Sequence, residues 1–225
     1  MGSNFQERFL TEPECYQLLK EKDFPVSPFA FCQSAEEACL KAQEIGFPLV
    51  IKIVSPDVIH KSDVGGVIVG VKEKRSLKKA YYQILRNVKS NIPNARIQGV
   101  LIQPFFHGGL EVIVGGLLDS QFGPAVMFGL GGIFVELLKD VTFRVAPFGM
   151  EEAKRMIKEV KGFSLLQGYR GKDPLDVEGL VFFLSKVSQF MYENPRVIEL
   201  DLNPVFLFPW GLVISDARMK VSSEL

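Results

Sequence analysis

Two β-rich apolar runs separated by a short polar loop are the feature that most constrains the fold of this chain. The runs are FPLVIKIV at residues 47–54 and GVIVGV at 66–71, and the loop between them leads into a Gly-Gly pair. An amphipathic segment follows at 76–91, with its apolar residues three and four positions apart. This order predicts strand, loop, strand and helix. Because the helix has one apolar face, we expect it to cover a sheet.

Two further helices are predicted before these strands. In the segment 11–24, Thr11 stands three residues before Glu14, a spacing typical of a capped helix start. The segment 34–46 begins with Ser34, a preferred N-cap residue, and ends at a glycine. The first hundred residues therefore alternate helix and strand.

The remainder of the chain is richer in strands. We expect strands at 99–106, 110–119, 123–132, 196–208 and 211–218, and helices at 151–160 and 174–194. The first three strands are so closely spaced that they favour an antiparallel meander. A composition shift near 92–99 predicts two α/β lobes, about 22–98 and 99–225, within one domain covering 1–225. The expected fold class is α+β.

Composition excludes several classes of protein. Lys+Arg and Asp+Glu are both 26, so no net positive field attracts nucleic acid or an anionic membrane surface. No apolar run approaches the roughly 20 residues of a membrane span, and the N-terminus has no apolar signal core. Cys15, Cys32 and Cys39 show no Cys-x-x-Cys spacing, which favours a reducing compartment. We therefore expect a cytoplasmic protein.

The first strand and the polar loop contain a candidate anion site. Lys52 lies between two valines on one face of its strand, so it either faces solvent or points at an anion in a cleft. In the loop, Gly65 and Gly66 would let the backbone approach a ligand, and His60 and Lys61 could contact phosphate oxygens. The plainer alternative is a polar hairpin loop. The spacing of a P-loop is absent.

A second candidate site lies near the C-terminus. In VIELDLNP, strand alternation puts Glu199, Asp201 and Asn203 on one face. Three oxygen-bearing side chains in a row need a positive neighbour, and Mg²⁺ prefers carboxylate and amide oxygens. A short hairpin would bring Asp216 beside Asn203. The alternative is a solvated strand face.

Two charged residues interrupt apolar surroundings between these sites. Glu136 and Arg144 therefore each need a partner or face a cleft. Taken together, a lysine and a Gly-rich loop in one lobe and oxygen ligands in the other describe an ATP site in a cleft between the lobes.

Several long motifs carry a resemblance to a known family. They are FPLVIKIVSPDVIHKSDVGGV, EVIVGGLLDSQFGPAVMFGLGGIFVELLKDVTFRVAP, LLQGYRGKDPLDVEGL and ELDLNPV. In these the chain resembles the ATP-grasp (beta) subunit of ADP-forming acetyl-CoA and acyl-CoA synthetases, enzymes of the succinyl-CoA synthetase superfamily. The resemblance covers nearly the whole chain.

The resemblance implies an acid–thiol ligase that converts acyl-CoA, ADP and phosphate into acid, CoA and ATP with Mg²⁺. It also implies a CoA-binding alpha subunit that carries a first phosphohistidine, in an α2β2 assembly. By the same resemblance His60 is a second phosphoryl carrier, which Asp63 could orient. Because neutral imidazole accepts phosphoryl groups near pH 7, this role is chemically reasonable.

The resemblance also assigns the other site residues. Lys52 would bind the nucleotide phosphates, and the loop chemistry described above adds Lys61 and the Gly65–Gly66 pair to this nucleotide site. The remaining assignments are Gln103 and Pro104 at an adenine-binding hinge, Glu111 near the ribose, Asn203 and Asp216 as Mg²⁺ ligands with Asp201 beside them, and Arg144 and Glu136 along the phosphoryl path.

Two alternatives stay open at this stage. One is another ATP-grasp carboxylate ligase that uses an acyl phosphate, and the other is a non-catalytic ATP-sensing subunit. The sequence leaves open the acyl group, the choice of ADP or GDP, and the oligomeric state.

Overall fold

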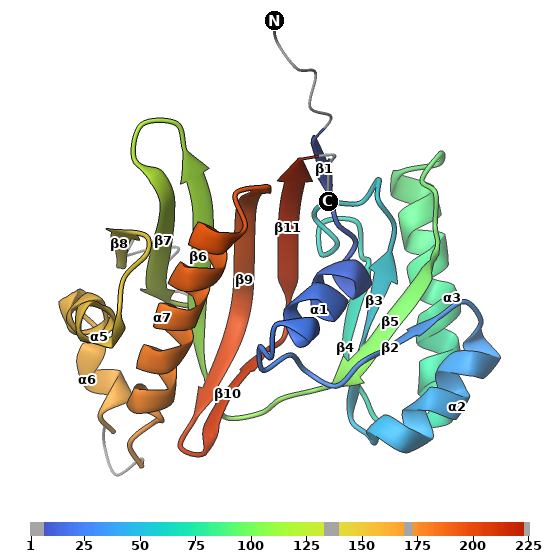
Figure 1. Cartoon of the computed structure of the whole chain (residues 1–225). Coiled ribbons are helices and arrows are strands. Elements are labelled where there is room, and N and C mark those ends of the chain that lie inside the picture. The colour runs from blue at the N-terminus through green and yellow to red at the C-terminus, as the bar shows by residue number, and fades with distance from the viewer. Residues whose placement is uncertain (1–6, 133–139, 169–172, 223–225) are drawn as a thin grey trace, which may run out of the picture. The chain divides into compact units, whose positions relative to one another are not determined.

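The computed structural model describes residues 7–132, 140–168 and 173–222 (Figure 1). The chain divides into two compact units. The N-terminal unit consists of Thr11–Gln17 and Ser27–His107, and the C-terminal unit of Met1–Leu10, Leu18–Val26 and Gly108–Leu225. Helix α1 (Glu12–Glu21) contributes its first turns to one unit and its last turn to the other.

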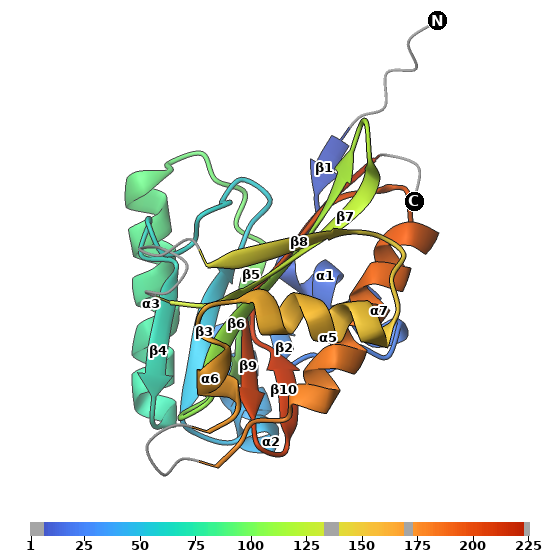
Figure 2. The ribbon, with the colours of Figure 1, turned by 90° about the vertical axis from the view of Figure 1, so that its left-hand side faces the viewer.

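The N-terminal unit is a four-stranded antiparallel sheet with helices packed on it. The strand order is β2-β5-β3-β4. The elements are β2 (Ala30–Cys32), α2 (Ala35–Ile45), β3 (Leu49–Val54), β4 (Val67–Val71), α3 (Lys74–Asn91) and β5 (Gly99–Pro104). Figure 2 shows α3 running along β4 and β3, with which it packs. The predicted strand–loop–strand–helix order is confirmed.

Local signals set the ends of these helices. Ser34 accepts a hydrogen bond from the Glu37 amide at 3.1 Å and caps α2, which ends at Gly46 with φ 90°. In α3, Glu73 and Ser76 form a capping box. Each helix then buries its apolar stripe in the core of the unit.

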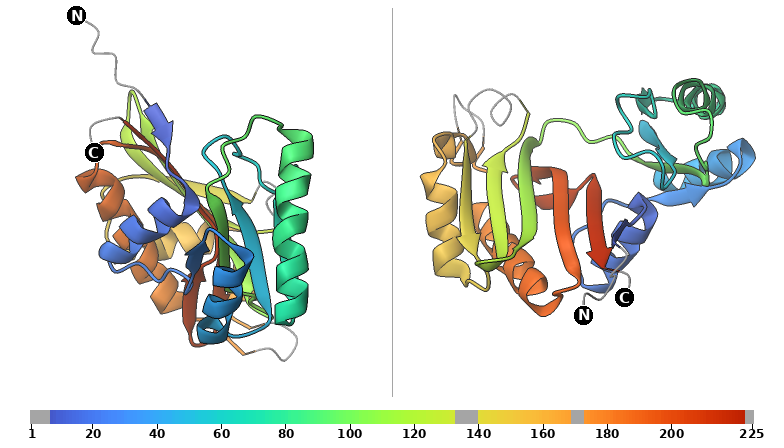
Figure 3. Two further views of the ribbon diagram at one scale, coloured as in Figure 1. Left: turned by 90° about the vertical axis from the view of Figure 1, so that its right-hand side faces the viewer. Right: turned by 90° about the horizontal axis from the view of Figure 1, so that it is seen from above.

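The C-terminal unit is a seven-stranded sheet, in the part of the chain that the structure describes. Its order is β1-β11-β9-β6-β7-β8, and β10 also pairs with β9. The strands are β1 (Glu7–Phe9), β6 (Leu110–Asp119), β7 (Gly123–Leu130), β8 (Val141–Val145), β9 (Val197–Phe208), β10 (Gly211–Ile214) and β11 (Ala217–Ser222). The helices are α5 (Met150–Glu159), α6 (Phe163–Leu166) and α7 (Val177–Glu193), and α7 packs along β6 and β7 (Figure 3). The mixture of helices and antiparallel sheets agrees with the predicted α+β class.

Two details of the predicted strand arrangement are wrong. Strand β5 pairs with β2 and β3 and not with β6, so of the meander that we expected over 99–132 only the antiparallel β6–β7 pair forms. The compact units divide after His107. The expected strand at 211–218 is two strands, interrupted at Ser215 and Asp216. Periodicity identifies strands but does not identify their partners.

We predict that Gly116→Val destabilises the protein through the contact between sheet and helix. A Cβ at Gly116 would lie 2.6 Å from Sδ of Met191 on α7. Overpacking of this kind costs about 1–3 kcal/mol, which denaturant unfolding would measure as a lower midpoint. Gly149→Ser is the control, because a Cβ there meets nothing within 4 Å and serine is a good N-cap for α5. Equal stability of the two variants would contradict the predicted close packing.

Candidate functional site

Lys52 is buried in the N-terminal unit and holds an ion pair there. Its side chain on β3 is 6% exposed, and Nζ donates to Oε1 of Glu12 at 2.6 Å. The alternative of a solvent-facing lysine is therefore wrong. All six residues of β3 are buried, so strand alternation says nothing here about exposure.

Glu12 was not among the predicted site residues. It lies in the first turn of α1, which starts where Thr11 N and Oγ1 both donate to Oε2 of Glu14. A helix N-terminus favours a carboxylate, and the side chain of Glu12 is 1% exposed. The only signal in the sequence was indirect: a strand lysine, if buried, needs a counter-charge.

Lys61 of the polar loop also reaches this carboxylate. Its Nζ lies 3.0 Å from Oε2 of Glu12, and its side chain is 17% exposed. One carboxylate thus bridges two ammonium groups, one from the sheet and one from the loop. The structure brings Lys52 and Lys61 together, as their predicted role at an anion site requires.

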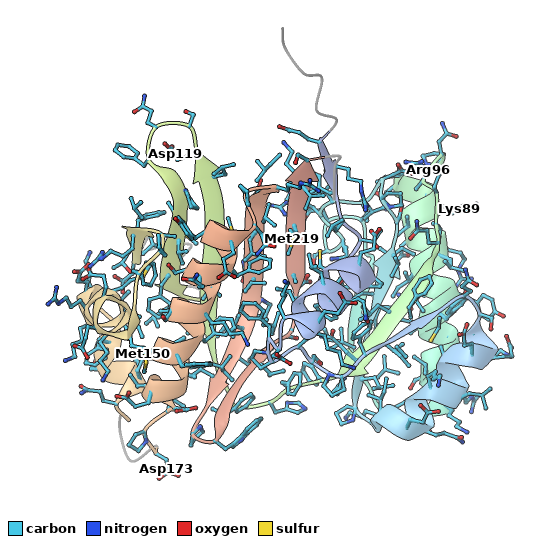
Figure 4. The ribbon with its side chains drawn as sticks, viewed as in Figure 1. Lys89, Arg96, Asp119, Met150, Asp173 and Met219 are labelled. Carbon is cyan, nitrogen blue, oxygen red and sulfur yellow. The ribbon has the colours of Figure 1, made fainter. Side chains whose placement is uncertain are left out.

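The loop at 55–66 is fixed at both of its ends. Near its start, Asp57 accepts from Arg96 at NH2 (2.7 Å), Nε (3.0 Å) and the backbone amide (2.7 Å); Arg96 is labelled in Figure 4. Near its end, Asn87 Nδ2 donates to the carbonyl of Gly65 at 3.0 Å, and Gly66 N donates to the carbonyl of Lys61 at 2.7 Å.

The glycine pair is needed for this loop conformation. Gly65 has φ 63°, which disfavours a side chain, and a Cβ at Gly66 would lie 2.7 Å from Ile53 on β3. The sequence suggested that these glycines let a ligand approach. The structure shows a further reason for them, the close approach of the loop to the sheet.

His60 stands exposed in the middle of this loop, next to Lys61. Asp63 is also exposed, and no hydrogen bond joins these two described side chains. Asp63 therefore does not orient the His60 ring in this conformation. His107, the second histidine, is exposed in the turn before β6 and packs its ring against Phe105 at 4.3 Å between centroids.

Gln103 and Pro104 lie at the end of β5. Gln103 is fully buried, and its Oε1 accepts from the Tyr16 hydroxyl at 3.1 Å. Glu111 lies in the other unit, exposed on β6, and its carbonyl accepts from Gly131 N at 2.7 Å. The unit boundary after His107 falls between these two sets of residues.

In the C-terminal unit, an arginine neutralises part of the acidic strand face. Arg218 on β11 pairs in register with Asp201 on β9. Its NH2 lies 2.8 Å from Glu199 Oε1 and 3.8 Å from Asp201 Oδ2. Arg218 is therefore one positive neighbour of these two carboxylates, and it was not among the predicted site residues.

Asn203 and Asp216 are neighbours, as the hairpin prediction requires. The Asn203 amide donates to the Asp216 carbonyl at 3.2 Å, between the paired stretches of β9 with β10 and of β9 with β11. Asn203 is exposed and Asp216 half-buried. No group of three His, Cys, Asp or Glu side chains that could hold a metal occurs among the described residues.

These two residues nevertheless fit Mg²⁺. Magnesium keeps several waters and is usually bound by one or two carboxylates plus substrate phosphates. One carboxylate and one amide oxygen agree with such a partial ligand set and not with a closed, all-protein cage.

Arg144 ties a strand to a helix in the C-terminal unit. Its Nε lies 2.6 Å from Glu152 Oε1 and its NH2 2.5 Å from Glu159 Oε1, both on α5. These hydrogen bonds, the one to Glu159 first, raise the pKa of the guanidinium. To act along the phosphoryl path, as expected, the Arg144 guanidinium would have to contact a phosphate group in addition to these two glutamates. Glu136, its expected companion, lies outside the described residues.

Comparison with known proteins identifies relatives over nearly the whole chain. A family model described as an ATP-grasp domain matches residues 3–221. The beta subunit of acetate–CoA ligase (ADP-forming) I from Pyrococcus furiosus is 46% identical over 214 residues, which are 95% of this chain and 92% of the relative. Acetate–CoA ligase (ADP-forming) I from Archaeoglobus fulgidus is 46% identical over 92% of this chain, which spans only 30% of that longer relative.

Solved structures give the same result. Acetyl-coenzyme A synthetase 1 of Ca. Korarchaeum cryptofilum, in complex with coenzyme A and Ca-AMPCP, matches with a TM-score of 0.92 and 48% identity, over 95% of this chain and 93% of the other. A second structure of that enzyme, with coenzyme A and Mg-AMPPCP, matches with a TM-score of 0.83 and 44% identity, over the same shares. Its phosphohistidine segment is described as pointing towards the nucleotide-binding site.

We predict that the Asp57–Arg96 pair stabilises the loop at neutral pH and fails only in acid. The hydrogen bonds from Arg96 lower the Asp57 pKa from its usual 3.8 to about 2. A carboxyl with a depressed folded-state pKa contributes stability above its unfolded pKa and loses that contribution as the pH falls through the folded pKa. Asp57→Asn should therefore lower the melting temperature at pH 7 and show a weaker pH dependence than the wild type between about pH 4 and 2. Asp63→Asn, an exposed carboxyl of the same loop, is the control, and identical acid profiles of all three proteins would refute the assignment.

Proposed function

Since this chain belongs to the ATP-grasp family, we propose that it is the nucleotide-binding beta-type subunit of an ADP-forming acyl-CoA synthetase. The observation that carries the proposal is the loop that exposes His60 beside Lys61, while the Lys61 side chain is held against the buried Lys52 through Glu12. A cation pair next to an exposed histidine is suited to receive a phosphoryl group and pass it to a nucleotide.

The proposed reaction has four group transfers. Phosphate attacks the acyl-CoA thioester, releasing CoA and forming an acyl phosphate. A histidine nitrogen then takes the phosphoryl group, releasing the carboxylate, and His60 takes it in turn from that histidine. Finally the nitrogen–phosphorus bond of phospho-His60 breaks as a terminal oxygen of ADP bonds to phosphorus, which gives ATP and restores neutral His60. Run in reverse, the same steps form acyl-CoA from ATP.

The residues of this chain bind and position the nucleotide for the last transfer. Lys52 and Lys61 would neutralise phosphate charge, which is the main source of catalysis in phosphoryl transfer. The Gly65–Gly66 segment would present its backbone to the phosphates. Gln103 and Pro104 would border the adenine, and Glu111 the ribose.

Magnesium would be held by Asn203 and Asp216, with Asp201 beside them. Bound there, it would neutralise phosphate oxygens that the two lysines do not reach. Arg144 and Glu136 are proposed to border the phosphoryl path. In the related synthetase the nucleotide analogue is present with magnesium, which supports this choice of metal.

A partner is expected to supply the remaining chemistry. The Pyrococcus relative is named a beta subunit, and the Archaeoglobus relative is more than three times as long as the matched region. We propose a CoA-binding alpha subunit that carries the first phosphohistidine, in an α2β2 assembly. Cytoplasmic location is proposed because none of the three cysteines forms a disulfide. No helix among the described residues is long and apolar enough to cross a membrane.

The alternatives differ in what they require of His60. An ATP sensor would need the lysines but no phosphoryl-accepting histidine. Another ATP-grasp carboxylate ligase would form its acyl phosphate directly on the nucleotide, so it would not need the histidine either.

We predict that His60→Ala keeps nucleotide binding but loses phosphoryl transfer. Reconstituted with the partner subunit, the variant should bind Mg-ADP with unchanged affinity, while ATP formation falls by roughly 10³-fold or more, as expected when a covalent relay is removed. ATP formation from acyl-CoA and phosphate measures the turnover, and calorimetry measures the binding.

His107→Ala is the matched control, because it removes the only other histidine from another exposed position. It should leave turnover unchanged. Normal ATP formation by His60→Ala would exclude the relay and favour one of the two alternatives.

We predict that Asp216→Ala raises the Mg²⁺ concentration needed for half-maximal turnover, by about tenfold or more for the loss of a carboxylate ligand. Asp173→Ala, an exposed carboxyl labelled in Figure 4, is the control. A Mg²⁺ titration of the reconstituted enzyme gives the comparison, and coincident curves would place the metal elsewhere.

A further inference from the structure

We propose that Glu12 is a positioning residue whose carboxylate holds Lys61, and therefore the segment that carries His60, close to Lys52. Nucleotide phosphates compete with the Glu12 carboxylate for these two lysines. The first half of this inference concerns the chain alone. The second half, on competition with phosphates, rests on the proposed nucleotide site.

The geometry makes Glu12 the centre of the cluster. Each of its carboxylate oxygens faces a different lysine, Oε1 at 2.6 Å from Lys52 and Oε2 at 3.0 Å from Lys61. The two lysines come from different elements, since Lys52 lies on β3 and Lys61 in the loop. The bridge is therefore a tie between sheet and loop.

Burial makes this tie stronger than an exposed pair. The side chains of Glu12 and Lys52 are 1% and 6% exposed, so their pairing is shielded from water and salt. Lys61, at 17%, is the most accessible of the three. The end of the bridge that can open is therefore the one attached to the loop.

The bridge acts on the middle of the loop. Asp57–Arg96 fixes the start, and Asn87 with the Gly66 amide fixes the end. Between them, the Lys61 side chain directs the segment that carries His60. Loss of Glu12 should therefore loosen the middle of the loop and leave both ends in place.

The Glu12 carboxylate also lowers the positive charge that the two lysines present to a phosphate. Two ammonium groups and one carboxylate sum to a single positive charge, whereas without Glu12 the sum is two. A phosphate oxygen that takes the place of a Glu12 oxygen satisfies the lysine equally well. Glu12 thus lowers the affinity of the two lysines for polyphosphate anions, while it fixes the positions of the lysine side chains and of the loop.

The test of the positioning role uses amide hydrogen exchange of the free chain. Glu12→Gln removes both ion pairs, and Lys61→Met removes only the loop side while the Glu12–Lys52 pair keeps the fold intact. Each should speed exchange in residues 58–63 by roughly tenfold, because loss of the ion pair favours local opening of the loop. The double variant should be no faster than either alone, because both break one tie.

Glu36→Gln is the matched control. It removes an ion pair of 2.6 Å, with Lys78, in the same unit but with both side chains more than half exposed. It should leave loop exchange unchanged. Unchanged exchange at 58–63 in Lys61→Met, or additive effects in the double variant, would overturn the positioning role.

The nucleotide experiment tests the second half separately. Calorimetry with ADP alone should show several-fold tighter binding to Glu12→Gln than to the wild type, while turnover of the reconstituted enzyme falls. Glu12→Asp, which keeps the charge, should bind ADP as weakly as the wild type. Tighter binding without loss of turnover, or equal binding by all three proteins, would overturn the competition. If the wild type itself binds no ADP, the proposed function fails, while the exchange result still decides the positioning role.

Discussion

A buried ammonium group inside a four-stranded sheet is the constraint on which the N-terminal unit depends. Lys52 lies among fully buried strand residues, and an unpaired charge there would cost several kcal/mol. Helix α1 begins at Glu12, the residue that supplies the counter-charge. The start of a short helix thus places the carboxylate that neutralises the buried lysine.

The C-terminal unit handles charge in a different way. Its acidic strand face is exposed or half-buried, and Arg218 lies across from it on the neighbouring strand. The pairing of β9 changes from β11 to β10 at Asn203 and Asp216. This change of partner brings together the two residues that are proposed to bind the metal, and Mg²⁺ takes few protein ligands.

Much of the local structure could be predicted, because local signals determine it. Capping residues and apolar stripes located α2 and α3 nearly to the residue, and alternation located β9 with its polar face. The partners of β5 could not be predicted, since strand pairing depends on contacts far apart in the sequence. Glu12 and Arg218 were missed for the same reason. A carboxylate in a first helical turn has the same sequence signature whether it is solvated or buried, and a cross-strand arginine is recognised only once the register is known.

Helix α1 carries a consequence for dissecting the molecule. The chain passes from one compact unit to the other after Leu10, Gln17, Val26 and His107, so no single cut separates the units. A fragment covering 27–107 would contain the whole four-stranded sheet but would lack Glu12, and Lys52 would lose its carboxylate partner. A fragment that keeps the pair must retain residues 11–17 together with 27–107, since both segments belong to the same compact unit.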